Sequence, residues 1–260
     1  MQPILQVEDV SHTYQAENGE VTAFEHVSFT VEKGRFLSIV GPSGCGKSTL
    51  LSVISGLMKP SAGRVLVGGE AVDGVSRRIG YMLQRDNLLE WRTIFSNVLF
   101  GLEIQGAKTP EAIARAENLL KTYGLYEFRA KYPRQLSGGM RQRAALIRTL
   151  ATGPEILLLD EAFSALDYQT RLSVTDDVYR ILKREQVTTL MVTHDIPESI
   201  SMGDEILILS CRPARVKEVL TVDFGPGRSP LTCRSDARFG KIFDHIWKEL
   251  STDETCSVGG

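Results

Sequence analysis

Alternating apolar and polar residues mark the first part of the chain as strands that lead into a helix. Val27, Phe29 and Val31 alternate with polar residues, which is typical of a strand with one buried face. The short apolar run Arg35–Val40 ends in glycine, and Leu50–Leu57 then carries apolar residues at helical spacing. This order predicts a strand, a glycine-rich loop and a helix in succession.

The middle of the chain changes to helical periodicity before strands return. Across residues 93–152, apolar residues recur every three or four positions. Apolar runs then follow at Ile156–Leu159, Thr188–Val192 and Glu205–Leu209, with a helical segment at 168–183 after the first of them. Alternating strands and helices predict a parallel α/β core, interrupted here by a helical insertion.

The chain ends in a predicted helix with one apolar face. The residues of that face are Phe239, Ile242, Phe243, Ile246, Trp247 and Leu250. Their spacing forms a stripe, so we expect this helix to dock on the core. Residues 253–260 are small or polar, and we expect them to be frayed.

Composition and charge narrow the class of protein without identifying it. The 260 residues are 42% hydrophobic and 24% charged, as in globular proteins, and the net charge of -2 gives no general attraction to nucleic acid. The four cysteines show no paired metal-ligand spacing, which fits a reducing compartment. We expect no signal peptide and no membrane span, so any membrane role would come through a partner.

A phosphate-binding pattern, G-x-x-x-x-G-K-[ST], follows the strand at 35–40. Its members are Gly41, Pro42, Ser43, Gly44, Cys45, Gly46, Lys47, Ser48 and Thr49. Glycines let backbone N–H groups turn inward around phosphate oxygens, and the following helix directs the positive end of its dipole at them. In such a loop Lys47 reaches the β- and γ-phosphates and the Ser48 hydroxyl ligates Mg²⁺. The loop predicts nucleotide binding, but it is shared by kinases, GTPases, helicases and transport ATPases.

Polar residues at the ends of three predicted strands are candidates for the reaction itself. Asp160 and Glu161 are adjacent, and neighbouring strand residues point to opposite faces, so we expect different roles. Asp160 would hold hydrated Mg²⁺, and Glu161 would orient or deprotonate the attacking water. His194 either contacts the γ-phosphate and Glu161 or is structural. Gln84 is a candidate for contact with Mg²⁺ or the water, although alone it carries almost no information.

A second anion site is predicted where the string LSGGMRQR begins at Leu136. Ser137 is a predicted helix N-cap, and Gly138 and Gly139 leave the following amides bare. This site has no lysine. A chain with one lysine-bearing loop and one lysine-free site suggests that two copies share each nucleotide.

These motifs, in this order, closely resemble those of the ATP-binding cassette (ABC) family, from Tyr14 to at least His194. In the terms of that family, Tyr14 is the aromatic residue that stacks on adenine, Gly41–Thr49 is Walker A and Gln84 is the Q-loop. The signature is Leu136–Met140, and Walker B is Ile156–Asp160, with Glu161 after it. The D-loop is Ser164–Asp167, and His194 is the switch histidine. Two positions depart from the family pattern. Met140 replaces the usual glutamine, and Ala162 stands where many members have proline.

The resemblance implies a fold and a set of partners. The fold is α/β, a P-loop NTPase with a RecA-like core, an N-terminal antiparallel β-subdomain and an inserted α-helical subdomain. The core and β-subdomain would span 1–92 and 153–224, the helical subdomain 93–152, and the C-terminal helix and tail 225–260. The implied assembly is a head-to-tail homodimer with two ATP molecules, on the cytoplasmic face of the membrane, coupled to transmembrane permease subunits.

Two further segments resemble one group of importers. The segments Asn87–Thr93 (NLLEWRT) and Ser210–Arg215 (SCRPAR) are similar to those of importers for nitrate, sulfonates, taurine, bicarbonate and pyrimidines. That group implies uptake of a small anionic or heterocyclic solute from a periplasmic or extracellular solute-binding protein. Glu90 stands where most of the group have proline, and Trp91 is either a permease contact or a buried anchor. We expect no additional β-domain after Arg215.

The alternative is a non-transport ABC ATPase that acts on nucleic acid or the ribosome. The long coiled coils, paired zinc cysteines or second cassette of such proteins do not occur in the sequence. A nucleotide kinase would not explain LSGG or His194. We therefore expect an ATP hydrolase coupled to transmembrane transport, with no nucleic-acid partner.

Overall fold

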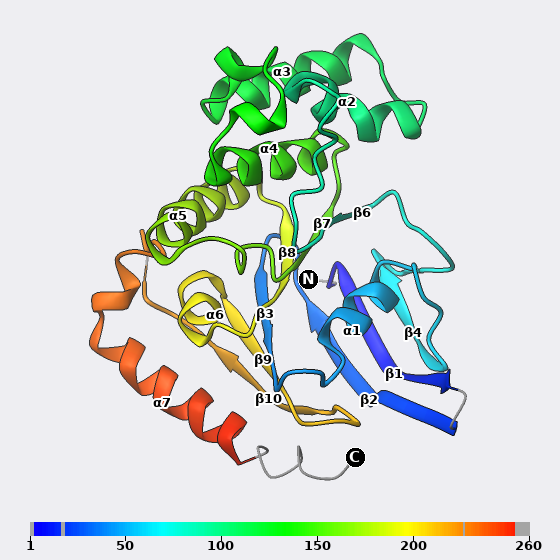
Figure 1. The fold of residues 1–260 in the computed structure, drawn as a ribbon. Helices are drawn as coiled ribbons and strands as arrows, with labels where there is room; N and C mark the ends of the chain where they lie inside the picture. The colour runs from blue at the N-terminus through cyan, green and yellow to red at the C-terminus, as the bar shows by residue number, and fades with distance from the viewer. Residues whose placement is uncertain (1–2, 17–18, 226, 253–260) are drawn as a thin grey trace.

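Two β-sheets and the helices around them make up the structure (Figure 1), a computed structural model that describes residues 3–16, 19–225 and 227–252. The larger sheet contains β3 (Phe36–Val40), β6 (Ile79–Met82), β7 (Ile156–Asp160), β8 (Thr188–Val192), β9 (Glu205–Leu209) and β10 (Val216–Thr221). Its order is β10-β9-β3-β8-β7-β6. All its pairings are parallel except that of β10 with β9. The predicted parallel core is therefore confirmed.

The smaller sheet is antiparallel and comes mostly from the beginning of the chain. It contains β1 (Leu5–Ala16), β2 (Gly19–Val31), β4 (Ala62–Val67) and β5 (Glu70–Ala71), in the order β2-β1-β4-β5. Val27, Phe29 and Val31 are buried as their alternation predicts. Helix α1 (Lys47–Ile54) lies between the two sheets (Figure 1).

Alternation along β7 assigns the two faces of the larger sheet. Ile156 and Leu158 join the apolar cluster formed with α1 and the smaller sheet, whereas Leu157 and Leu159 join the cluster on the other face. Successive strand residues point to opposite faces, so a fully apolar strand is buried on both sides. Asp160 continues the first series, which places it on the α1 face.

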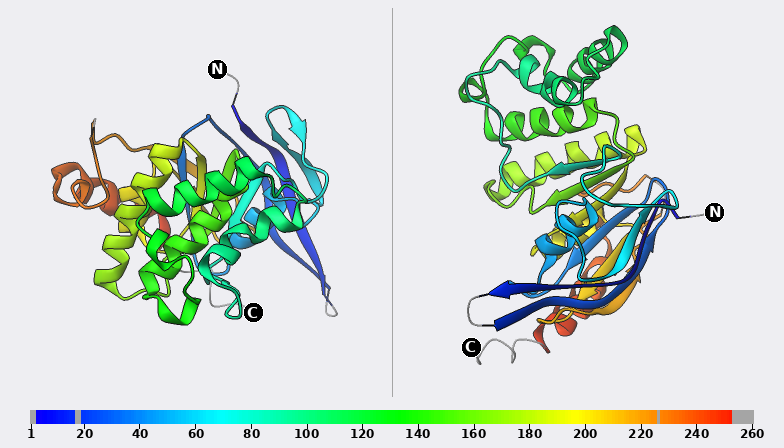
Figure 2. Two further views of the ribbon diagram at one scale, coloured as in Figure 1. Left: turned by 90° about the horizontal axis from the view of Figure 1, so that it is seen from above. Right: turned by 90° about the vertical axis from the view of Figure 1, so that its right-hand side faces the viewer.

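The remaining helices have recognisable caps, and all of them were expected from the sequence except the short helix at residues 196–202. They are α2 (Ile94–Ile104), α3 (Pro110–Thr122), α4 (Gly138–Ala151), α5 (Tyr168–Glu185), α6 (Ile196–Met202) and α7 (Ala237–Ser251), with short 3-10 turns at Tyr126–Phe128, Pro133–Gln135 and Cys233–Ser235. Pro110 begins α3, where its missing N–H costs nothing. Helices α2, α3 and α4 gather at one end of the molecule, beyond α5 (Figures 1 and 2).

Helix α7 docks on the core as expected, with one exception along its apolar stripe. Ile246 is fully buried against a cluster that includes Ile200 and Ile208. Trp247 is wrongly assigned to the buried stripe, because it is 57% exposed and stacks on Phe243 at the helix surface. One residue advances a helix by about 100°, which moves position 247 off the stripe centred on 246.

Beyond Arg215, the described residues form β10, a 3-10 turn and α7, without a further β-domain. The predicted fraying of residues 253–260 lies outside the described residues. Among the helices of the described part, none has both the length and the apolar content that crossing a bilayer requires.

Candidate functional site

The phosphate loop connects the carboxyl end of β3 to the start of α1. Gly46 caps α1 with a φ of 108°, and Gly44 has a φ of 73°, conformations that residues with a Cβ rarely adopt. The Lys47 ammonium points into the loop and donates to the carbonyl oxygens of Gly41 at 2.8 Å and Pro42 at 2.9 Å. Its side chain therefore lies where a triphosphate would be enclosed.

Ser48 and Asp160 meet on the α1 face of the larger sheet. The Ser48 hydroxyl donates to Asp160 Oδ1 at 2.9 Å, and the Tyr81 hydroxyl donates to Asp160 Oδ2 at 3.1 Å. Burial raises the pKa of Asp160, and the two donated hydrogen bonds oppose that shift by stabilising the carboxylate. A hydroxyl and a carboxylate beside a phosphate loop are the hard oxygen ligands that Mg²⁺ prefers.

Glu161 is positioned by a turn and not, as the sequence suggested, by strand alternation. It follows the end of β7 with a φ of 45°, unusual for a residue with a side chain. Its N–H donates to Val192 O at 2.9 Å, which fixes this backbone against β8. The carboxylate then lies 3.3 Å from Nδ1 of His194, so the structure brings these two predicted residues together.

Gln84 reaches the same turn through Ser164, the first residue of the predicted D-loop. Its amide nitrogen donates to the Ser164 hydroxyl at 3.1 Å, and that hydroxyl donates to the Glu161 carbonyl at 2.9 Å. Ser164 therefore links the Gln84 segment to the backbone that positions the carboxylate. The position in the D-loop was visible in the sequence, but its contact with a residue 80 positions away was not.

Tyr14 lies on β1 beside the helix that follows the phosphate loop. Its hydroxyl is 2.8 Å from that of Thr49, and its ring meets His12 edge to face at 4.7 Å between centroids. The side chain remains 38% exposed. An aromatic ring held at its hydroxyl end, next to the loop, has a face available for stacking.

The predicted second anion site is at the start of α4, apart from the phosphate loop of the same chain (Figure 1). Ser137 caps α4 by accepting a hydrogen bond from the Met140 N–H at 3.4 Å. A Cβ on Gly139 would lie 2.8 Å from Val174, so this glycine also permits close packing of α4 on α5. The exposed Gly138 has no such constraint.

The two departures from the family pattern, and the one from the importer group, have local explanations. Met140 packs its side chain against the apolar cluster of α4 and α5. Ala162 is buried, and its carbonyl accepts a hydrogen bond from the side chain of Gln142. Glu90 forms an ion pair with Arg141 at 3.2 Å, a contact that proline would not provide. The residues at these three positions therefore make their own contacts with neighbouring segments, although the residues usual in the family or group are absent.

Trp91 is 75% exposed, so the buried-anchor alternative for it is wrong. Nearby, a groove of about 500 Å³ lies between residues 84–88 and the first turns of α4. Arg141 donates to Asp86 at 2.9 Å across one end of this groove. Arg148 also holds this segment, because it donates to the backbone carbonyls of Asp86 and Asn87.

Tyr81 is a further residue of the site to which no motif in the sequence points. The strand around it was expected, but its hydroxyl became relevant only when β6 paired with β7 and placed Tyr81 opposite Leu158. Both residues then face α1, as Asp160 does. The signal available in the sequence was a tyrosine in an otherwise apolar strand, because a buried hydroxyl requires a partner.

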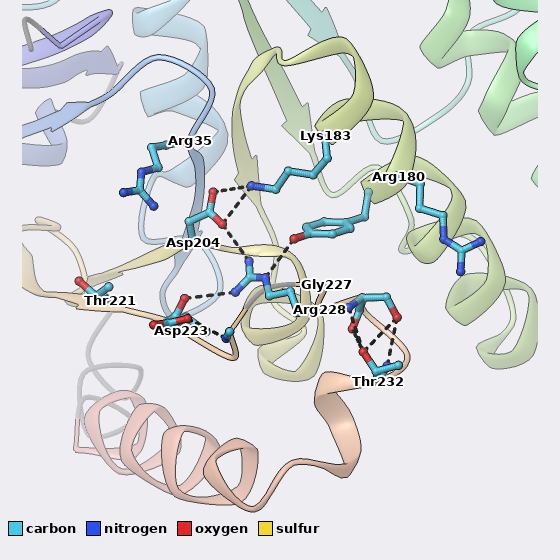
Figure 3. A pocket seen from close by; sticks show the side chains of 13 residues that line it. Arg35, Arg180, Lys183, Asp204, Thr221, Asp223, Gly227, Arg228 and Thr232 are labelled. Carbon is cyan, nitrogen blue, oxygen red and sulfur yellow. Dashed lines mark hydrogen bonds and ion pairs between the residues drawn. The ribbon is translucent and has the colours of Figure 1, made fainter.

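A separate cavity of about 870 Å³ lies between α5, β10 and the segment before α7 (Figure 3). Lys183 and Arg228 both point at Asp204, at 2.7 and 3.1 Å (Figure 3). The Arg228 guanidinium also donates to Tyr179 and to backbone carbonyls, and its side chain is only 8% exposed. This arrangement ties the segment before α7 to the core, and none of the described residues that line the cavity belongs to the phosphate loop.

The fold and the phosphate loop define the P-loop class of nucleotide-binding α/β proteins. A family model described as "ABC transporter" matches residues 24–164, more than half of the chain. The chain therefore belongs to the ABC transporter family.

Relatives and solved structures agree with this assignment. The chain is 48% identical to the uncharacterized ABC transporter ATP-binding protein YtlC of Bacillus subtilis, over 96% of both chains. It is 36% identical to the nitrate import ATP-binding protein NrtD of Synechocystis sp., again over 96% of both. A dimeric structure of the ATP-binding cassette MJ0796 bound to ADP and Pi matches with a TM-score of 0.71 and 31% identity, covering 85% of this chain and 100% of that one.

Proposed function

We propose that this chain is the ATP-hydrolysing subunit of an importer for a small solute. The observation that carries the proposal is the convergence of Lys47, Ser48, Asp160 and the Glu161–His194 pair around one phosphate loop. The pairs Ser48–Asp160 and Glu161–His194 each join residues from different elements. Hydrolysis of a metal-bound triphosphate would require both pairs in one reaction.

In this proposal the phosphate loop binds and orients ATP. Lys47 neutralises the β- and γ-phosphates, and Ser48 and Asp160 would hold Mg²⁺ beside them. When bound, that ion would supply positive charge against the charge that develops on the phosphates. Tyr14 stacks on the adenine, and the backbone amides of residues 41–49 donate to phosphate oxygens.

Glu161 then acts on the attacking water. Its carboxylate orients the water and accepts its proton, and His194, whose Nδ1 lies 3.3 Å from that carboxylate, contacts the γ-phosphate. Gln84 reports nucleotide occupancy, because its contact through Ser164 joins the catalytic turn to the segment that faces α4. All three roles are proposals from geometry.

The reaction requires a second copy in this proposal. Ser137, Gly138 and Gly139 lie apart from the phosphate loop of their own chain, so they would close on the nucleotide of a partner in a head-to-tail homodimer. The start of α4, where Ser137 and Gly138 are exposed, would provide the amides for this contact. The dimer described for the related cassette MJ0796 supports this arrangement.

Transport would follow from movement of residues 93–152 relative to the core formed by 1–92 and 153–224. Arg141 and Arg148 tie the segment after Gln84 to α4, so a shift of α4 would move the groove and the exposed Trp91 with it. We assign this groove to permease subunits, with the chain on the cytoplasmic face of the membrane. A periplasmic or extracellular binding protein would deliver the solute to the permease.

The proposed solute is small and either anionic or heterocyclic. This part of the proposal is supported by the nitrate importer among the relatives and by the segments NLLEWRT and SCRPAR. In this proposal cargo is selected outside this chain, so transport assays with the chain reconstituted in a complex with its permease subunits would identify the solute directly.

The Glu161→Gln variant tests the catalytic proposal. It keeps the shape of the side chain but removes the base, so we expect ATP binding and a stable dimer with turnover reduced by about 10²–10⁴. Phosphate release and gel filtration with Mg-ATP measure the two properties. The control is Glu205→Gln, the same change at the opposite end of a core strand, which should retain turnover. Hydrolysis by Glu161→Gln at the wild-type rate would contradict the role of Glu161.

A further inference from the structure

The turn between β9 and β10, residues 210–215, lies next to the phosphate loop although the two are about 170 residues apart in sequence. This proximity follows from the sheet, in which β9 pairs in parallel with β3, so both strands end at the same edge. The base of the loop packs directly on the end of β9. A Cβ on Gly41 would lie 3.1 Å from that of Leu209.

The turn is fixed at its base without help from Arg212. The Ser210 N–H donates to Arg215 O at 2.9 Å, and the Arg215 N–H donates to the Ser210 hydroxyl at 2.9 Å. Ala214 exchanges hydrogen bonds with the backbone of β2. The Arg215 guanidinium pairs with Glu25 at 2.7 Å. The guanidinium of Arg212 is therefore carried on a turn that is already held by other contacts.

Arg212 uses this position to contact the phosphate loop. Its Nη2 donates to Gly44 O at 2.9 Å, and its Nε is 3.3 Å from the same oxygen. The carbonyl belongs to the peptide unit whose N–H is that of Cys45. In a trans peptide the C=O and N–H point in opposite directions, so drawing the carbonyl outward turns the Cys45 N–H toward the interior of the loop. That N–H donates to Pro42 O with an N···O distance of 3.3 Å, and Lys47 donates to the same carbonyl, so the amide points into the loop.

We infer that Arg212 is a positioning residue for ATP binding: it holds the Gly44–Cys45 peptide so that its amide faces the phosphates. The inference rests on the proposed function of the loop. It gives a role to the SCRPAR segment, which the catalytic residues leave unexplained. Gly44 makes this orientation adjustable, because a glycine with positive φ has alternative conformations of similar energy. The hydrogen bond from Arg212 therefore restrains a Gly44–Cys45 peptide that could otherwise adopt other orientations.

The test compares Arg212→Ala, Arg212→Lys and Arg215→Ala by equilibrium binding of Mg-ATP and of ADP. Loss of one hydrogen-bonded contact predicts about threefold to tenfold weaker binding for Arg212→Ala. Both nucleotides should be affected alike, because the loop amides contact phosphates that ATP and ADP share. Arg212→Lys retains a charged donor and should recover most of the affinity. Under saturating ATP, kcat of Arg212→Ala should stay within about twofold of wild type.

Arg215→Ala is the matched control, since it removes a neighbouring arginine that holds the turn to Glu25 and not the phosphate loop. It should bind both nucleotides as the wild type does. Unaltered binding by Arg212→Ala, or an equal loss in Arg215→Ala, would overturn the inference while leaving the proposed function in place. Failure of the wild-type chain to bind ATP would overturn both.

Discussion

Glu198 offers a quantitative test of how the segment that carries His194 is built. This side chain is buried in α6, where the Thr193 hydroxyl donates to it, and its other oxygen has no partner among the described residues. Burial raises the pKa of Glu198 from 4.5 to about 7. The hydrogen bond from Thr193 opposes this shift, Asp195 adds to it, and Arg171 and His194 oppose it. The folded protein therefore favours a neutral carboxyl at this position.

The sign and size of the effect follow from linkage. A pKa raised by folding gives stability that is fully present below pH 4.5 and is lost as pH rises through about 7. Each pKa unit corresponds to about 1.4 kcal/mol, so the rise of the Glu198 pKa from 4.5 to about 7 corresponds to about 3 kcal/mol of folding free energy. Most of this, roughly 2–3 kcal/mol, should be lost between pH 5 and pH 8.

The Glu198→Gln variant is neutral at every pH, so it should not lose this contribution. We expect its free energy of unfolding, relative to wild type, to increase by roughly 2–3 kcal/mol between pH 5 and pH 8. Urea unfolding followed by circular dichroism at both pH values measures the difference. Glu127→Gln, which removes an exposed carboxylate, is the control and should show little pH-dependent change. A constant difference between Glu198→Gln and wild type would refute the reasoning.

Three further predictions address the dimer, the C-terminal segment and the permease contact. Lys47→Ala and Ser137→Ala should each lower turnover, and mixing them should restore some, because a mixed head-to-tail dimer has one site without either substitution; no recovery would contradict shared sites. Arg228→Met removes a buried ion pair and several hydrogen bonds, so urea unfolding should show a loss of about 3 kcal/mol, and a loss below about 1 kcal/mol would refute that role. Trp91→Ala should leave the ATPase activity of the isolated chain unchanged but weaken co-purification with the permease; equal recovery would exclude Trp91 from the contact.

Local chemistry made the phosphate loop and the helix caps predictable. Lys47 and Ser48 need only a strand before them and a helix after them, and the pattern of nine residues specifies both. Ser137 caps α4 as predicted because an N-cap depends on hydrogen bonds to residues two or three positions away. Apolar runs alternating with helical segments likewise predicted the parallel core, since burial on both faces leaves only apolar residues in β7 before Asp160.

Tertiary structure alone decided which of these residues meet. The register of β6 against β7 brings the Tyr81 hydroxyl within hydrogen-bond distance of Asp160. The pairing of β9 with β3 likewise brings Arg212 within hydrogen-bond distance of the Gly44 carbonyl. The direction of Glu161 depends on a left-handed backbone fixed by a hydrogen bond to β8, which strand alternation does not predict. The sequence by itself therefore determined the elements and the chemical groups that they carry. Their pairing required the fold, because contacts between distant residues depend on how the sheets and helices pack.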